Sequence, residues 1–133
     1  FSRIPRRYFL FNLKIKVMKP IENMYIWRES RVLVNIIYDM MKMCNDYSFK
    51  NQIQRAAISV MNNIAEGAES GSNAKYVNFL NIAKGSCSEV HSMLYLCEDF
   101  KYCSFDERER VQSKIKQISV GIARLINYLS KTK

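Results

Sequence analysis

A single histidine and four cysteines are the residues whose side chains could do chemistry in this chain. His91 follows Glu89 by two positions, so on a helix the two side chains point to different faces. That spacing is incompatible with the Glu-x-x-His pairs that hold two iron ions in helical bundles. Cys87 lies one helical turn before His91, but neither residue belongs to a recognised nucleophile motif. We expect no catalytic residues, no metal site and no cofactor.

The remaining patterns give no support to other enzyme classes. Gly67 and Gly71 precede no phosphate-binding loop, and residues 107–110 alternate in charge, which is typical of a solvent-exposed helix face. No two cysteines form a C-x-x-C pair, which favours reduced thiols and a cytoplasmic protein over a disulfide scaffold. No apolar stretch is long enough to cross a membrane. We therefore expect a cytoplasmic protein without enzymatic activity. The cysteines are Cys44, Cys87, Cys97 and Cys103.

The elements that must position these residues are helices. The chain has 133 residues, of which 48% are hydrophobic and 25% charged, and it holds only 4 Gly and 2 Pro. A β-sandwich or barrel needs many turns, so the scarcity of turn residues disfavours an all-β fold. A chain of this length is enough for one domain with its own core.

Apolar residues recur at spacings of three and four in four stretches of the chain, with one skipped turn at Ser30 in the first, as they do along one face of an amphipathic helix. The apolar faces are Trp27, Val34, Ile37, Met41 and Cys44; Ile53, Ala57, Val60 and Ile64; Tyr76, Leu80, Ala83, Cys87, Val90, Leu94 and Cys97; and Val111, Ile115, Ile118, Ile122, Leu125 and Leu129. Four such helices joined by short loops bury these faces only against one another. The sequence predicts an all-α fold, an antiparallel up-and-down four-helix bundle over residues 21–133.

Several residues are expected to mark helix ends. The second helix is predicted from Gln52, and Gly67 is expected to end it in a left-handed conformation. Ser72 or Asn73 is expected to cap the third helix. The fourth begins with a capping box, in which Ser104 and the glutamate three residues later satisfy each other's backbone donors.

The third helix carries a second apolar stripe beside its core face. One explanation is a wide face buried in the monomer core. The other is a contact between subunits, because a monomer exposing such a stripe would leave a contiguous apolar patch. We predict that Phe79, Ile82 and Leu96 contribute to a subunit interface. The stripe consists of Phe79, Ile82, Met93, Leu96 and Phe100.

The net charge of +9 is unevenly distributed along the chain. Residues 1–20 hold six Lys and Arg and no acid, which leaves 15 basic and 12 acidic residues, or +3, in residues 21–133. We therefore treat residues 1–20 as a separate basic segment. It is expected to be either disordered or upstream of a natural start at Met18, with an extended conformation as the alternative if it is ordered.

Two strings in the second and third predicted helices resemble one protein family. The second helix contains Gln52-Ile53-x-Arg55-Ala56-Ala57, then Ser59, then Asn63-Ile64-Ala65-Glu66-Gly67, and the third contains Phe79-Leu80-x-Ile82-Ala83-x-Gly85-Ser86-x-Ser88-Glu89. Together with Trp27 ahead of an amphipathic stretch, they resemble the bacterial four-helix bundle proteins named after the intervening sequences of 23S ribosomal RNA genes. The resemblance covers roughly residues 21–131.

The resemblance implies a cytosolic bundle that assembles into a ring, with a pentamer expected. It also implies similarity to accessory proteins of diversity-generating retroelements, basic pentamers that engage a reverse transcriptase and nucleic acid. The family has no accepted catalytic residues, so Arg55, Asn63, Glu66 and Glu89, which match motif positions, receive only structural roles. The loop over residues 69–75 has few of the Lys and Arg that relatives often carry there, which weakens a role for it in binding phosphate.

The leading functional hypothesis is a non-enzymatic oligomeric protein that binds structured RNA or a nucleoprotein through a basic surface whose location the sequence does not reveal. A charge of +3 on each of five copies gives +15, which could supply salt-sensitive phosphate contacts. The alternative is a protein-interaction adaptor that docks a partner helix on the exposed apolar stripe of the third helix.

Overall fold

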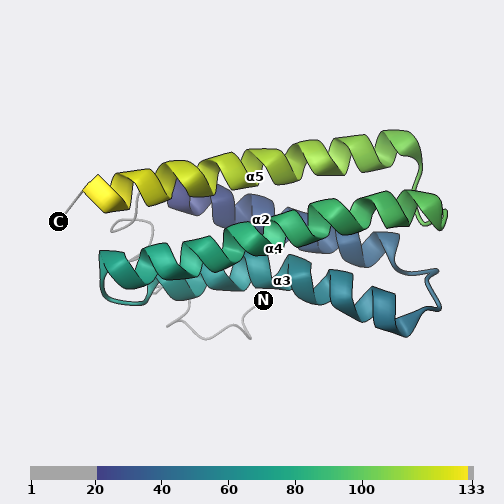
Figure 1. Cartoon of the computed structure of the whole chain (residues 1–133), viewed down its shortest axis with the longest axis horizontal. Coiled ribbons are helices and arrows are strands. Elements are labelled where there is room, and N and C mark those ends of the chain that lie inside the picture. Colours follow the sequence, from purple (N-terminus) through teal and green to yellow (C-terminus); the bar gives the residue numbers. More distant parts are fainter. Residues whose placement is uncertain (1–20, 132–133) are drawn as a thin grey trace, which may run out of the picture.

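The computed structural model describes residues 21–131, which form four helices. They are α2 (Ile21–Met40), α3 (Tyr47–Ala68), α4 (Asn73–Asp99) and α5 (Phe105–Lys131). Successive helices run in opposite directions along one elongated bundle (Figure 1). Each packs against the next in sequence, and α2 packs against α5 to close the bundle. The predicted all-α up-and-down four-helix bundle is confirmed. The basic segment 1–20 lies outside the described residues.

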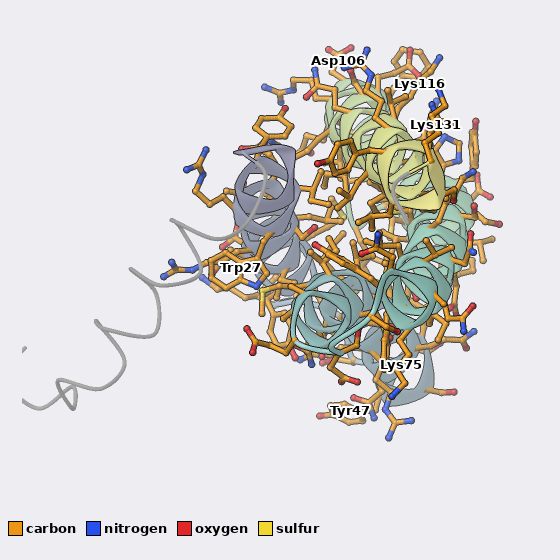
Figure 2. All side chains as sticks on the ribbon, turned by 90° about the vertical axis from the view of Figure 1, so that its left-hand side faces the viewer. Trp27, Tyr47, Lys75, Asp106, Lys116 and Lys131 are labelled. Carbon is orange, nitrogen blue, oxygen red and sulfur yellow. The ribbon has the colours of Figure 1, made fainter. Side chains whose placement is uncertain are left out.

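The interior is filled by the apolar faces that the spacing predicts. Every residue predicted for the faces of α3, α4 and α5 is buried. Figure 2 looks along the bundle and shows side chains from all four helices meeting in the middle, while Lys116 and Lys131 of α5 lie at the outside. A continuous core of this kind gives each helix its main source of stability.

The first half of α2 differs from the prediction by a small rotation. Ile26 and Leu33 are fully buried, whereas Trp27 and Val34 are only half-buried. Ser30 lies in the core between Ile26 and Leu33, and its hydroxyl donates a 2.6 Å hydrogen bond to the carbonyl of Ile26. Because that local bond satisfies the hydroxyl, a serine is tolerated on the buried face.

The helix starts are set by side-chain caps. Asp46 caps α3 by accepting a 3.1 Å bond from the Phe49 amide, so α3 begins at Tyr47, ahead of the predicted start at Gln52. Ser72 caps α4 by accepting a 3.2 Å bond from the amide of residue 75, as expected. Ser104 and the glutamate at 107 form both bonds of the predicted capping box, at 2.9 and 3.1 Å.

Gly67 does not end α3 in a left-handed conformation, and that prediction is wrong. The helix continues to Ala68, and among the described residues positive φ occurs only at Gly71 (88°) and Lys101 (66°). Gly67 is required for a different reason, since a Cβ atom there would lie 2.7 Å from Cδ1 of Tyr76 and 3.0 Å from Cβ of Phe79. The glycine lets the first turns of α4 pack directly on the backbone of α3.

Arg108 is buried, which corrects its placement on a solvent-exposed face. Its guanidinium forms an ion pair with Glu98 of α4 and donates a 2.7 Å bond to Oε1 of Gln112. It also lies between the rings of Tyr95 and Phe105, 4.6 and 5.0 Å from their centroids. The hydrogen bond and charge of Glu98 raise the pKa of Arg108 above its ordinary value. This cluster joins α4 to α5.

Candidate functional site

The chemically reactive residues serve structural roles or are held in unreactive forms. His91 is half-buried, packs edge-on against Tyr95 at 5.9 Å, and accepts a 3.0 Å bond at its backbone carbonyl from Gln112. Burial raises the pKa of the Cys87 thiol to about 12, and burial with two neighbouring cysteines raises that of Cys97 to about 12. Neither thiol supplies the thiolate that nucleophilic chemistry needs at neutral pH.

Two further features of the described residues bear on function. Across residues 21–131 no cluster of three or more His, Cys, Asp or Glu is placed to hold a metal ion. In the same range no helix is long and apolar enough to span a bilayer.

The family-like strings meet at the seam between α3 and α4. Ser86 of α4 donates a 2.8 Å hydrogen bond to the hydroxyl of Ser59 on α3, and Asn63 donates to the carbonyl and hydroxyl of Ser59 at 2.8 and 3.0 Å. One turn along, Gln52 donates a 3.3 Å bond to Glu89. Asn63 and Glu89 thus take part in polar contacts that hold this seam.

Arg55 and Glu66, the other two motif residues, lie exposed on α3. No side-chain hydrogen bond or ion pair joins either of them to another residue in the described part of the chain. The structure brings Asn63 together with Ser59, and Glu89 with Gln52, but it gives the side chains of Arg55 and Glu66 no hydrogen bond or ion pair among residues 21–131.

The second stripe of α4 is divided between core and surface. Met93 is buried and Phe79 half-buried, so the wide-core explanation holds for Met93 and in part for Phe79. Ile82, Leu96 and Phe100 are 53%, 41% and 51% exposed. The wide-core explanation therefore fails for these three, and the role of Phe79, Ile82 and Leu96 in an interface stays a prediction.

The backbone of α4 is uncovered beside this stripe. A Cβ atom on Gly85 would have no neighbour within 4 Å. The chain's own packing therefore does not require a glycine at this position, in contrast to Gly67. A glycine in the interior of a helix destabilises it relative to alanine, so Gly85 costs stability without a gain inside the subunit.

A hollow in the described part of the bundle lies between α2 and α5. The two helices touch closely where a Cβ on Gly121 would lie 2.5 Å from Cγ2 of Ile26. Beyond that contact, towards the end of α2 and the start of α5, a groove of about 1080 Å³ opens, bounded at one end by the α4–α5 loop. Its floor is apolar. The apolar residues that line it are Val32, Ile36, Met40, Met43 and Val111.

The same groove is strongly basic. Its acidic residues are Asp39, which pairs with Lys42 at 2.9 Å, and Glu107, which is bound in the capping box of α5. Hydrogen bonds from Ser104 lower the pKa of Glu107. Both acids are thus engaged locally. The basic residues that line the groove are Arg28, Arg31, Lys101, Arg110 and Lys114.

Most of the cations in the groove have no acidic partner. Lys114 forms a 2.5 Å ion pair with Glu29 across α2 and α5. No ion pair joins Arg28, Arg31 or Arg110 to an acid in the described part of the chain, and the same is true of the lysine at 101. Four of the five groove cations therefore form no ion pair among the described residues, although the charge of Arg110 contributes to lowering the pKa of Glu107. The excess of positive charge around one concave surface favours an anionic ligand.

The sequence patterns did not predict this groove, although the spacing of its basic residues within each helix is visible in the sequence. Arg28 and Arg31 are three residues apart and Arg110 and Lys114 are four apart, so each pair shares one helix face. What the sequence does not show is that these two faces meet, because α2 and α5 are paired only by the closure of the bundle.

The fold and this surface define a small four-helix bundle protein with a basic, apolar-floored groove. The chain belongs to the family of 23S rRNA-intervening sequence proteins, whose family model matches residues 22–124. This confirms the family indicated by the strings in α3 and α4.

A solved structure supports the fold. It is the crystal structure of a protein of unknown function from the S23 ribosomal protein family of Bacteroides thetaiotaomicron, with a TM-score of 0.71 and 23% identity. The match covers 80% of this chain and 98% of that one. At this identity the likeness shows the shared bundle alone. No match was found among curated proteins.

Proposed function

We propose that this protein binds structured RNA through the groove between α2 and α5, without catalysing a reaction. The observation that carries the proposal is the set of four groove cations that form no ion pair within the described residues. The name of the family, which refers to an intervening sequence of 23S rRNA, favours RNA over other polyanions. The groove supplies the basic surface that the net charge alone did not locate.

Assembly of several copies would strengthen this binding. We infer a ring, with a pentamer as the expected size, in which Phe79, Ile82 and Leu96 contribute to subunit contacts beside the uncovered backbone at Gly85. Exposure of Ile82 and Leu96 supports this inference, because a subunit contact would cover them. A ring would repeat the groove in each subunit and so resemble the basic assemblies of the retroelement accessory proteins.

The proposal is tested by titrating the full chain with a fluorescently labelled RNA hairpin at several salt concentrations. Each phosphate contact contributes a slope of about −0.7 to −0.9 to log K against log salt. The double variant Arg31→Gln/Arg110→Gln is expected to weaken binding and to make the slope shallower by about 2. The matched control, Lys84→Gln/Lys116→Gln, removes two exposed cations outside the groove and is expected to retain most of the affinity.

Three results would contradict the proposal. They are no binding at low salt, affinity that does not fall as salt rises, and equal losses in the groove and control variants. The last result would mean that the charge of the whole molecule, and not the groove, attracts RNA.

The adaptor function remains a second candidate because Leu96 and Phe100 are exposed on α4. It predicts that a partner protein co-purifies after nuclease treatment and is lost in a Leu96→Glu variant. A partner that disappears with nuclease alone would instead be bridged by nucleic acid.

A further inference from the structure

The end of the groove at the α4–α5 loop combines a cation with a half-buried tyrosine that belongs to a cluster of aromatic rings. Lys101 and Tyr102 both line the groove there. The ring of Tyr102 lies 5.9 Å from that of Phe49 and 6.2 Å from that of Phe100, and Phe49 and Phe100 meet edge to face at 5.7 Å. Phe100 does not line the groove, but its ring is half exposed next to that of Tyr102. Tyr102 is the aromatic residue among those that line the groove, so this end is where an aromatic surface adjoins it.

Lys101 occupies a backbone position that favours glycine. Its φ of 66° is left-handed, its amide donates a 3.1 Å bond to the carbonyl of Glu98, and the amide of Tyr102 donates a 2.8 Å bond to that of Cys97. This is the Schellman arrangement at the end of α4, in which the left-handed residue is usually glycine because a Cβ atom is unfavourable there. The lysine is therefore unfavourable for the backbone, and its side chain lines the groove.

The ring of Tyr102 packs against two other aromatic rings. Interaction with the Cys44 thiol, followed by burial, raises the pKa of the Tyr102 phenol to about 12. A phenol is uncharged at neutral pH even at its ordinary pKa, so the ring places no negative charge beside the groove cations. Contacts with Phe49 and Phe100 restrict it further, so that little side-chain freedom remains to be lost on binding.

We propose that this end of the groove binds an unpaired nucleotide of RNA, with the base stacked against Tyr102 and Phe100 and the adjoining phosphate at Lys101. This inference rests on the proposed function, since it specifies which RNA feature the same groove takes. Base faces are hidden inside a duplex, whereas bulged and looped bases stack on aromatic side chains. A cationic surface alone is enough to bind a uniform duplex. An aromatic surface next to these cations is therefore better suited to a bulge or a loop, whose bases are accessible.

The experiment compares two RNAs that differ in one feature. One is a blunt duplex, and the other is the same duplex with a three-nucleotide bulge, each titrated against the full chain in one salt concentration. Stacking of a single base on an aromatic side chain corresponds to at least about a fivefold gain in affinity. We expect the bulged RNA to bind more tightly by that factor or more, and Phe100→Leu, which keeps an apolar side chain but removes the aromatic face, to abolish the preference. Tyr128→Leu, at an exposed aromatic residue near the C-terminal end of α5 and away from the α4–α5 loop, is the matched control and should retain it.

The Lys101→Gly variant gives an independent readout. It is expected to bind the bulged RNA several-fold more weakly while its melting temperature stays the same or rises, because glycine suits the left-handed backbone. A lysine present only for packing would give the opposite pair of results. Unchanged affinity in Lys101→Gly would overturn the assignment of this residue.

The outcomes separate this inference from the proposed function. If duplex and bulged RNA bind equally well and with the same salt dependence, the inference is wrong and the proposed function stands. If neither RNA binds at low salt, both are wrong. If a helical peptide rich in glutamate displaces the bulged RNA at equal concentration, the aromatic end does not select RNA and the inference is again overturned.

Discussion

Ser86 on α4 donates a 2.8 Å hydrogen bond to the hydroxyl of Ser59 on α3, at a point where both helices carry strings typical of the family. Asn63 donates to the same hydroxyl at 3.0 Å. The Ser59 hydroxyl is thus the centre of a small polar network between two helices whose buried faces are mainly apolar. Such a network fixes the alignment of the two helices if all of its members are satisfied.

Ser59→Ala is expected to destabilise the protein by about 1–3 kcal/mol, because the buried hydroxyl of Ser86 loses its partner. The double variant Ser59→Ala/Ser86→Ala should cost less than the sum of the two single changes, since both ends of the bond are then removed. Urea unfolding followed by circular dichroism measures all three values. Strictly additive losses would show that the two hydroxyls do not interact.

Two glycines that match the family strings are expected to respond in opposite ways to alanine. Gly67→Ala should destabilise the protein by about 1–3 kcal/mol, because the new Cβ would lie 2.7 Å from the ring of Tyr76. Gly85→Ala should stabilise the isolated subunit by about 0.5–1 kcal/mol, because the site is open and helical. Thermal unfolding of the two variants beside the parent provides the comparison. A stabilising Gly67→Ala would mean that α4 does not pack as closely on α3 as described.

Leu96→Glu is expected to lower the mass of the assembly while leaving the helix content intact. Leu96 is 41% exposed in the subunit, so a charge there is tolerated by the monomer and is costly only when a second copy covers it. Leu94→Ala, at a fully buried neighbour, should instead cost about 2–5 kcal/mol of stability. Light scattering and circular dichroism distinguish the two effects. A parent that is already monomeric, or a Leu96→Glu chain that unfolds, would contradict the interface.

The stability of the fold is expected to fall as the pH rises from about 9 towards 12. In the folded protein the pKa of Cys87 and of Cys97 is about 12, against an ordinary value of 9.0. Above pH 9 the thiols of the unfolded chain lose their protons, whereas those of the folded chain keep them. The contribution of these two thiols to the free energy of unfolding is therefore complete below pH 9 and is lost as the pH approaches 12. Urea midpoints measured at several alkaline pH values should show the decline. Cys87→Ala should make the decline of the urea midpoint with pH less steep. Parallel declines in the parent and the variant would show that ionisation of the Cys87 thiol is not their cause.

Sequence patterns predicted nearly all of the core and little of the candidate site. The apolar faces of α3, α4 and α5 follow from local periodicity, because each needs only some apolar neighbour to pack against. The capping box of α5 depends only on contacts within that helix. Arg108 was misplaced because its burial depends on Glu98 of another helix and on the rings of Tyr95 and Phe105. The groove was missed for the same reason, since Arg31 and Arg110 become neighbours only when the bundle closes.

Gly67 shows a subtler limit of sequence patterns. Its place near the end of an amphipathic stretch suggested a turn, but its function in the fold is to let another helix approach. A glycine near a helix end is consistent with both roles. The distinction requires knowing that Tyr76 lies opposite, which local spacing does not reveal.

The pairing of α2 with α5 also determines the order in which parts of this molecule can come together. The other helix contacts join neighbours along the chain and can form through short loops, whereas α2 meets α5 only after nearly the whole chain has been arranged. Closing so long a loop has a high entropic cost and is slow, so α2 is the helix whose amide protons should exchange first with solvent in the native state. An RNA held in the groove would contact both sides of this joint. If bound RNA stabilises the packing of α2 against α5, amide exchange should become slower throughout α2, including at residues that the RNA does not contact.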